Sequence, residues 1–140
     1  MLVRDFKTQD SDALVEILKA NQQYGHPELD GPEALRAVQN CIAAEFLVAE
    51  ENGKPIGLMR GVFDGSRAII YLASVHRDYQ RQGIGTALLH EITLRFKERG
   101  AKAISVTIPG DPSFWKRFGF RQTTRVMSAY PIDEVLARTS

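Results

Sequence analysis

The sequence has few cysteines, little net charge and no long apolar run, and each shortage argues against a class of protein. One cysteine among 140 residues cannot form a disulfide within the chain, so we expect a reducing, cytoplasmic setting. The formal net charge is +1, which gives no overall field for a nucleic acid. The apolar runs are far too short to span a bilayer, and no charged-then-apolar signal opens the chain. Neither a nucleic acid nor a membrane is therefore an expected partner.

What is present is the composition of a globular domain, 44% apolar and 25% charged. A chain of this length is expected to fold as one domain, residues 1–140, with room for an apolar core. Histidine, cysteine and carboxylate residues nowhere show the spacing of a metal site. We therefore expect no bound metal.

The most informative segment is 74–89, SVHRDYQRQGIGTALL, in which the end of an apolar strand runs into a polar turn, two glycines and an amphipathic helix. The first N–H groups of a helix have no intrahelical partner, and the helix dipole favours negative charge there. Gly83 and Gly85 carry no Cβ, so a phosphate can approach the backbone closely. The spacing is neither that of a P-loop nor that of a Rossmann fingerprint. The expected ligand carries a phosphate or pyrophosphate.

Hydrophobic periodicity and turn residues predict the remaining elements. Their order, β-α-α-β-β-β-α-β-α-β, predicts a mixed α+β sheet with one β-α-β crossover across the glycine turn. Asp30 and Glu33 have the spacing of a capping box and predict the start of the second helix. The expected strands are 2–6, 46–50, 55–63, 68–75, 102–108 and 120–130, and the expected helices begin near residues 8, 30, 83 and 112.

Two motifs resemble those of the GNAT superfamily of N-acetyltransferases. Gln80-x-x-Gly83-x-Gly85 resembles the family's loop for the pyrophosphate of acetyl-CoA, and 114–120, FWKRFGF, resembles its Phe-Tyr-x-x-Leu-Gly-Phe segment. The element order is similar to that of the family fold, a three-layer α/β/α sandwich, over nearly the whole chain. Residues 61–89 look closest to small bacterial acetyltransferases of the YpeA type.

The resemblance implies an acetyl-CoA-dependent N-acetyltransferase. It would transfer an acetyl group to a primary amine, of a small molecule or a peptide or protein, by direct attack in a ternary complex. The backbone of the glycine turn would hold the pyrophosphate, and the strand before it would pair with the two amides of the pantetheine arm. The implied cofactor-binding residues are Ala73, Ser74, Val75, Gln80, Arg81, Gln82, Gly83, Ile84, Gly85, Thr86 and Trp115.

The chain departs from the family at both proton-transfer positions. An amine must lose its proton before it attacks, and a free lysine is only about one part in a thousand neutral near pH 7.4. The family's frequent glutamate base corresponds to Tyr71, which is the candidate catalytic residue; it could orient a water or the amine, or pack on a neighbour. The family's tyrosine acid corresponds to Trp115, which cannot supply a proton; it could line the thioester slot or pack beside other aromatic residues.

The segment before the second helix corresponds to the family's variable substrate wall, and Tyr24, His26 and Glu28 are the candidates there for binding a cationic amine. The two departures keep a second interpretation open, a CoA-binding GNAT-like module with little catalysis that acts as a sensor or partner subunit. The sequence leaves both a monomer and a homodimer open, and it does not identify the acceptor amine.

Overall fold

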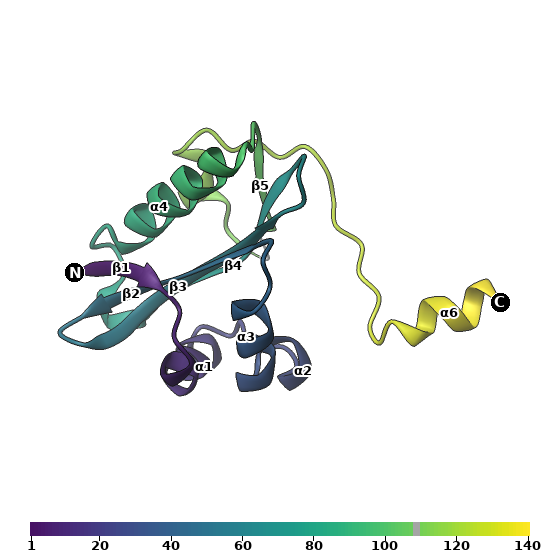
Figure 1. The fold of residues 1–140 in the computed structure, drawn as a ribbon, viewed down its shortest axis with the longest axis horizontal. Helices are drawn as coiled ribbons and strands as arrows, with labels where there is room; N and C mark the ends of the chain where they lie inside the picture. The colour runs from purple at the N-terminus through teal and green to yellow at the C-terminus, as the bar shows by residue number, and fades with distance from the viewer. Residues whose placement is uncertain (108–109) are drawn as a thin grey trace. The chain divides into compact units, whose positions relative to one another are not determined.

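The computed structural model describes residues 1–107 and 110–140. It divides into a first unit, Met1–Thr107, and a second unit that holds the rest of the chain. Five strands in the described residues form one mixed sheet in the order β1-β2-β3-β4-β5 (Figure 1). Neighbouring strands are antiparallel except for β4 and β5, which are parallel. The strands are β1 Leu2–Asp5, β2 Ala44–Glu51, β3 Lys54–Phe63, β4 Ala68–Val75 and β5 Ile104–Val106.

Helices cover both faces of this sheet. Figure 1 shows α1, α2 and α3 on one face and α4 on the other, which confirms the expected three-layer α+β arrangement. Among the described helices none is both long and apolar enough to cross a membrane. The helices of the first unit are α1 Ser11–Ala20, α2 Pro27–Asp30, α3 Pro32–Gln39 and α4 Ile84–Arg99, with the 3₁₀ turns η1 Thr8–Asp10 and η2 Arg77–Tyr79.

The apolar side chains form a separate core on each face. The stripe expected on the long helix is buried, and it packs on the α4 side of the sheet; its members are Ile84, Leu88, Leu89, Ile92 and Phe96. On the other face one cluster joins α1 and α3 to the sheet; its members are Phe6, Leu14, Val15, Ile17, Leu18, Leu35, Phe46, Val48 and Leu58. Burial of these side chains removes apolar surface from water and holds the layers together.

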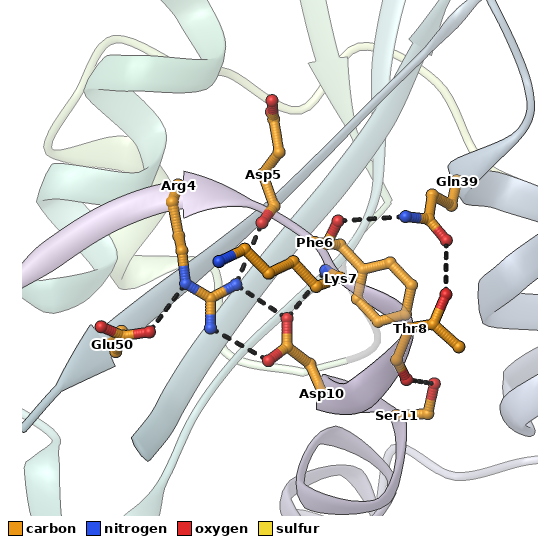
Figure 2. A network of polar contacts seen from close by, with 9 residues as sticks. All are labelled: Arg4, Asp5, Phe6, Lys7, Thr8, Asp10, Ser11, Gln39 and Glu50. Carbon is orange, nitrogen blue, oxygen red and sulfur yellow. Dashed lines mark hydrogen bonds and ion pairs between the residues drawn. The ribbon is translucent and has the colours of Figure 1, made fainter. Parts of the chain in front are cut away.

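A partly buried ion pair fixes β1 to the start of α1 (Figure 2). Arg4 donates from Nη1 and Nη2 to the two carboxylate oxygens of Asp10 at 2.8 and 3.0 Å, and from Nε to Glu50 Oε1 at 2.8 Å. Asp10 Oδ2 also accepts from Lys7 N at 2.8 Å. The hydrogen bonds that Arg4 donates to the Asp10 carboxylate are the main cause that raises the pKa of Arg4. Because the forked geometry matches a carboxylate, this network orients the two elements.

The second helix does not begin as expected. Its N-cap is Gly31, followed by Pro32 at the first helical position, where the missing N–H of proline costs nothing. Asp30 instead ends the short helix α2, and its Oδ2 accepts from Gly25 N at 3.1 Å. The capping-box prediction at Asp30 is therefore wrong, because a proline two residues later sets the helix start.

The second unit contains α5, Ser113–Lys116, and α6, Asp133–Thr139. The strand expected over 120–130 is wrong, since none of these residues lies in a strand. Phe120 is half-buried, the side chains of 121–130 are exposed, and Met127 is 95% accessible. A strand is stabilised by pairing and by packing of one face, and residues 121–130 pair with no strand in the described chain and have no buried face. The expected strand 102–108 is shortened to β5, and its last residue, 108, lies outside the described residues.

Candidate functional site

Strand β4 has a different neighbour along each half. The paired half, Ala68–Ile70, is bonded to β3 on one side and to β5 on the other. The register with β3 then shifts so that Tyr71 is an extra residue on β4, which is a β-bulge. Beyond it lies the open half, Leu72–Val75, which in the described chain pairs with β3 and with no other strand.

The bulge shifts by one residue which positions of β4 point their backbone polar groups away from β3. In the paired half, Ile70 O accepts from Thr107 N at 3.2 Å, on the β5 side. After the bulge, His76 N donates to a carbonyl of β3 at 2.7 Å. Alternate residues of an antiparallel strand point opposite ways, so the N–H and C=O groups of Ala73 and Val75 point away from β3. The open half thus offers an edge to which an extended amide chain can add.

Side-chain carboxamides occupy the carbonyls of this edge. Gln23 Nε2 donates to Ala73 O at 2.9 Å. Asn21 Nδ2 and Gln80 Nε2 both donate to Val75 O, at 2.9 and 3.0 Å. With both carbonyls engaged, the two N–H groups are what the open half offers to a ligand. Sequence reasoning missed Asn21 and Gln23, because they lie in a polar run after α1 with no motif.

The glycine turn follows directly and opens α4 as expected. Gly83 is the N-cap of α4 with φ +84°, a left-handed conformation that favours glycine. A Cβ on Gly83 would meet no atom within 4 Å, so the space beside it is open. The N–H groups of the first helical turn, including those of Gly85 and Thr86, lack intrahelical partners. Ile84 buries its side chain in the core, so it can meet a ligand only through its backbone.

The side chains of the turn are placed differently from one another. Gln80 contacts the end of β4 through Val75 O, and Gln82 Nε2 donates to Asp78 O at 3.4 Å. Arg81 is exposed and adopts φ +64°. Among Gln80, Arg81 and Gln82, Arg81 alone carries a positive charge that can attract a phosphate.

The predicted substrate wall is made by α2 and the residues before it. Tyr24 is half-buried against the α1–α3 core, and Lys19 Nζ lies 5.2 Å from its ring centre. His26 precedes α2, Glu28 lies in its first turn, and both are exposed. Arg60 of β3 lies beneath this segment and donates to Leu29 O at 3.2 Å. Burial lowers the pKa of Arg60, against the opposing effect of Asp30.

The two positions of the expected proton transfers differ in environment. Tyr71 sits at the bulge with 52% of its surface exposed, so its ring is not part of the core. Trp115 lies in the second unit and is buried there. It packs edge to face with Phe114 and Phe120, at centroid distances of 5.0 and 5.5 Å. These contacts give Trp115 a packing role within its own unit.

No group of three or more histidine, cysteine or carboxylate residues gathers as for a metal within the described residues. The acetyltransferase (GNAT) domain model matches residues 43–122, which include β4, the glycine turn and α4. The chain belongs to the GNAT acetyltransferase family.

Solved structures show the same fold at low sequence identity. A transcriptional regulator from Bacillus halodurans C-125 is 22% identical over 92% of this chain and 98% of its own, with a TM-score of 0.79. An aminoglycoside acetyltransferase from an uncultured soil metagenomic sample is 20% identical over 92% and 93%, with a TM-score of 0.72. An aminoglycoside 6'-N-acetyltransferase complexed with coenzyme A is 17% identical over 72% and 58%, with a TM-score of 0.62.

Proposed function

We propose that this GNAT chain is an acetyl-CoA-dependent N-acetyltransferase that acetylates a primary amine by direct attack in a ternary complex. The observation that carries the proposal is the continuity of two binding surfaces. The open half of β4, with outward N–H groups at Ala73 and Val75, runs through η2 into the glycine turn at the start of α4. Coenzyme A has a pantetheine arm with two amides that is followed by a pyrophosphate, so the strand edge suits the arm and the glycine turn suits the pyrophosphate.

The residues present fit this co-substrate. The N–H groups of the turn and of the first turn of α4 would bind the pyrophosphate, with Arg81 adding charge. The space where Gly83 lacks a Cβ admits the phosphate. On β4, Val75 N–H would donate to a pantetheine carbonyl and Ala73 N–H to the thioester carbonyl. A solved structure of similar fold holds coenzyme A, which supports the assignment of the ligand class.

The transfer step then needs little side-chain chemistry. The neutral amine forms a C–N bond with the acyl carbon, the C–S bond breaks, and the thiolate leaves with the electron pair. The proton released by the amine ends on the sulfur, directly or through water. The N–H of Ala73 would stabilise the negative charge that develops on the acyl oxygen. We assign Tyr71, exposed at the bulge, to orienting the amine or a water; Trp115 transfers no proton.

A thiol with a pKa near 8.5 leaves as a thiolate at neutral pH without a strong acid. We propose a small-molecule or peptide amine as acceptor, bound along the wall that carries Tyr24, His26 and Glu28. Residues 1–140 would then act as one cytoplasmic GNAT domain, as a monomer or a homodimer, without a metal.

A second candidate is a CoA-binding module with little catalysis, acting as a sensor or partner subunit. It is favoured by the two departures from the family pattern at Tyr71 and Trp115. The two candidates bind the same ligand and differ only in turnover.

Calorimetry with acetyl-CoA, followed by thiol release in the presence of primary amines, separates them. Binding with amine-dependent thiol release supports the enzyme. Binding of acetyl-CoA without thiol release in the presence of sisomicin, spermidine, lysine or a peptide with a free amino group supports the CoA-binding module. Absence of acetyl-CoA binding by the folded protein would contradict both.

A further inference from the structure

The connection after α1 places one carboxamide, that of Gln23, beside Ala73, where we propose that the thioester carbonyl binds. α1 ends in a Schellman motif, in which Gln23 N donates to Leu18 O at 2.8 Å and Gln22 N to Lys19 O at 3.1 Å. Gln22 takes the left-handed conformation that this motif requires, with φ +59°. The backbone position of Gln23 is therefore set by the helix end and does not depend on its side chain.

The side chain of Gln23 reaches the open half of β4 from this fixed point. Its Nε2 donates to Ala73 O at 2.9 Å. Because the partner is a carbonyl, the nitrogen must face it, and this orients Oε1 away from Ala73 O. Ala73 N–H and C=O leave the strand on the same side. A thioester carbonyl bound at Ala73 N–H would thus lie next to the Gln23 carboxamide.

Asn21, at the same edge of β4, has a carboxamide whose contacts are structural, and it serves as a comparison for Gln23. Its Nδ2 donates to Val75 O at 2.9 Å and to Ser74 Oγ at 2.7 Å, and Ser74 is buried. Asn21 therefore ties the connection to β4 by two bonds. Gln23 makes one such bond from its nitrogen and is only half-buried, which leaves its oxygen for a ligand.

We propose that Gln23 positions the acceptor amine, because Gln23 Oε1 accepts a hydrogen bond from one N–H group of the amine. This inference rests on the proposed acetyltransferase function and deepens it. The neutral amine has two N–H bonds and one lone pair. One N–H donates to Gln23 Oε1, the lone pair attacks the acyl carbon, and the C–S bond breaks to release the thiolate. The proton that leaves the nitrogen goes to the thiolate, directly or through water, and Gln23 gains and loses none.

The kinetic test replaces the carboxamide by an apolar side chain of similar length, Gln23→Met. Gln9→Met is the matched control, because Gln9 is exposed on η1. With sisomicin, spermidine, lysine and Ala-Ala-Ala as acceptors, we expect kcat/KM for the best amine to fall about tenfold, the scale of one lost hydrogen bond. The Kd of acetyl-CoA and the Tm should stay near those of the wild type.

Three results would contradict the inference. Unchanged kcat/KM in Gln23→Met would remove Gln23 from the amine site. A drop in Tm together with weaker acetyl-CoA binding would make it a structural link like Asn21. Tighter acetyl-CoA binding in Gln23→Met would show that Gln23 competes with the pantetheine arm for Ala73 O.

A second measurement needs no acceptor. In ¹⁵N-labelled protein the Gln23 side-chain amide signal is identified by its loss in Gln23→Met. We expect its protection from solvent exchange to persist when acetyl-CoA is added, because the Nε2 bond to Ala73 O is kept. Loss of protection would overturn the inference. If the wild-type protein binds no acetyl-CoA, the proposed function itself fails; if it binds and acetylates while either Gln23 result is negative, only this inference fails.

Discussion

The two halves of β4 belong to one continuous strand and have different neighbours. In the paired half, Ala68 and Ile70 are buried and their backbone groups bond to the β5 side. In the open half, the carbonyls of Ala73 and Val75 accept hydrogen bonds from side chains and not from a neighbouring strand. An exposed strand edge invites unwanted pairing, and here Asn21, Gln23 and Gln80 cover its carbonyls. One bulge residue, Tyr71, separates the half that is paired on both sides from the half to which we assign ligand binding.

The largest effect is expected where the open half meets the glycine turn. Gly83→Asp should abolish acetyl-CoA binding, because a carboxylate would project into the space proposed for the pyrophosphate. Calorimetry on the folded variant measures this.

Gly83→Asn is the matched control for that charge. Asn and Asp both tolerate the left-handed conformation at this position, so the two variants differ mainly by one negative charge. Equal affinities of Gly83→Asp and Gly83→Asn would place the pyrophosphate elsewhere.

The next prediction compares the two halves of β4 by placing a proline, which has no backbone N–H, in each of them. Ala73→Pro removes an N–H that points away from β3, so the ladder with β3 stays intact. We expect kcat to fall by about 10²-fold, as when an oxyanion donor is lost, while the protein remains folded. Ile70→Pro removes a group on the β5 side and should lower the Tm strongly. Thermal melts and kcat of both variants give the comparison, and an active Ala73→Pro enzyme would contradict it.

Arg81→Gly should weaken acetyl-CoA binding about tenfold at low salt, the scale of a charge-assisted contact. Because Arg81 has φ +64°, glycine also relieves the backbone there. The Tm of Arg81→Gly should therefore not fall, although its affinity for acetyl-CoA does. An unchanged Kd at low ionic strength would remove Arg81 from the site.

Tyr71→Phe keeps the ring at the bulge and removes only the hydroxyl. We expect kcat to fall on the order of tenfold, less than the roughly 10²–10⁴ of an essential acid or base. Activity of the wild type should rise with pH as the amine deprotonates. Full activity of Tyr71→Phe would show that the Tyr71 hydroxyl does not contribute, and that catalysis depends on positioning of the reactants.

The smallest effect lies at the turn before the paired half. The carboxylate of Asp64 accepts from Arg67 N and Ser66 N, both at 2.8 Å, and these bonds lower the pKa of Asp64. Its contribution to stability is therefore full above its ordinary pKa of 3.8 and is lost as the pH falls through the lowered value. Asp64→Ala should lower the Tm slightly at pH 7 and not at about pH 2. Acetyl-CoA affinity should not change, and a loss of it would mean that the two ends of β4 are coupled.

Local patterns predicted some of these elements and not others. The glycine turn and the long helix were predicted closely, since α4 starts after Gly83 and ends at Gly100. Asp30 was misassigned because Pro32, a stronger local signal, sets the start of α3. The strand over 120–130 was predicted from local patterns along the sequence, which do not supply a neighbouring strand.

By itself the sequence determined the strand that leads to the turn, the left-handed glycine and the apolar stripe of α4, because these depend on local conformation and periodicity. Only the tertiary structure decided which half of β4 is open, since the extra residue at Tyr71 is defined by its register with β3. It also decided that Gln23 meets Ala73, residues 50 positions apart in the chain. Such a contact depends on how α1 packs on the sheet, and no spacing along the sequence encodes it.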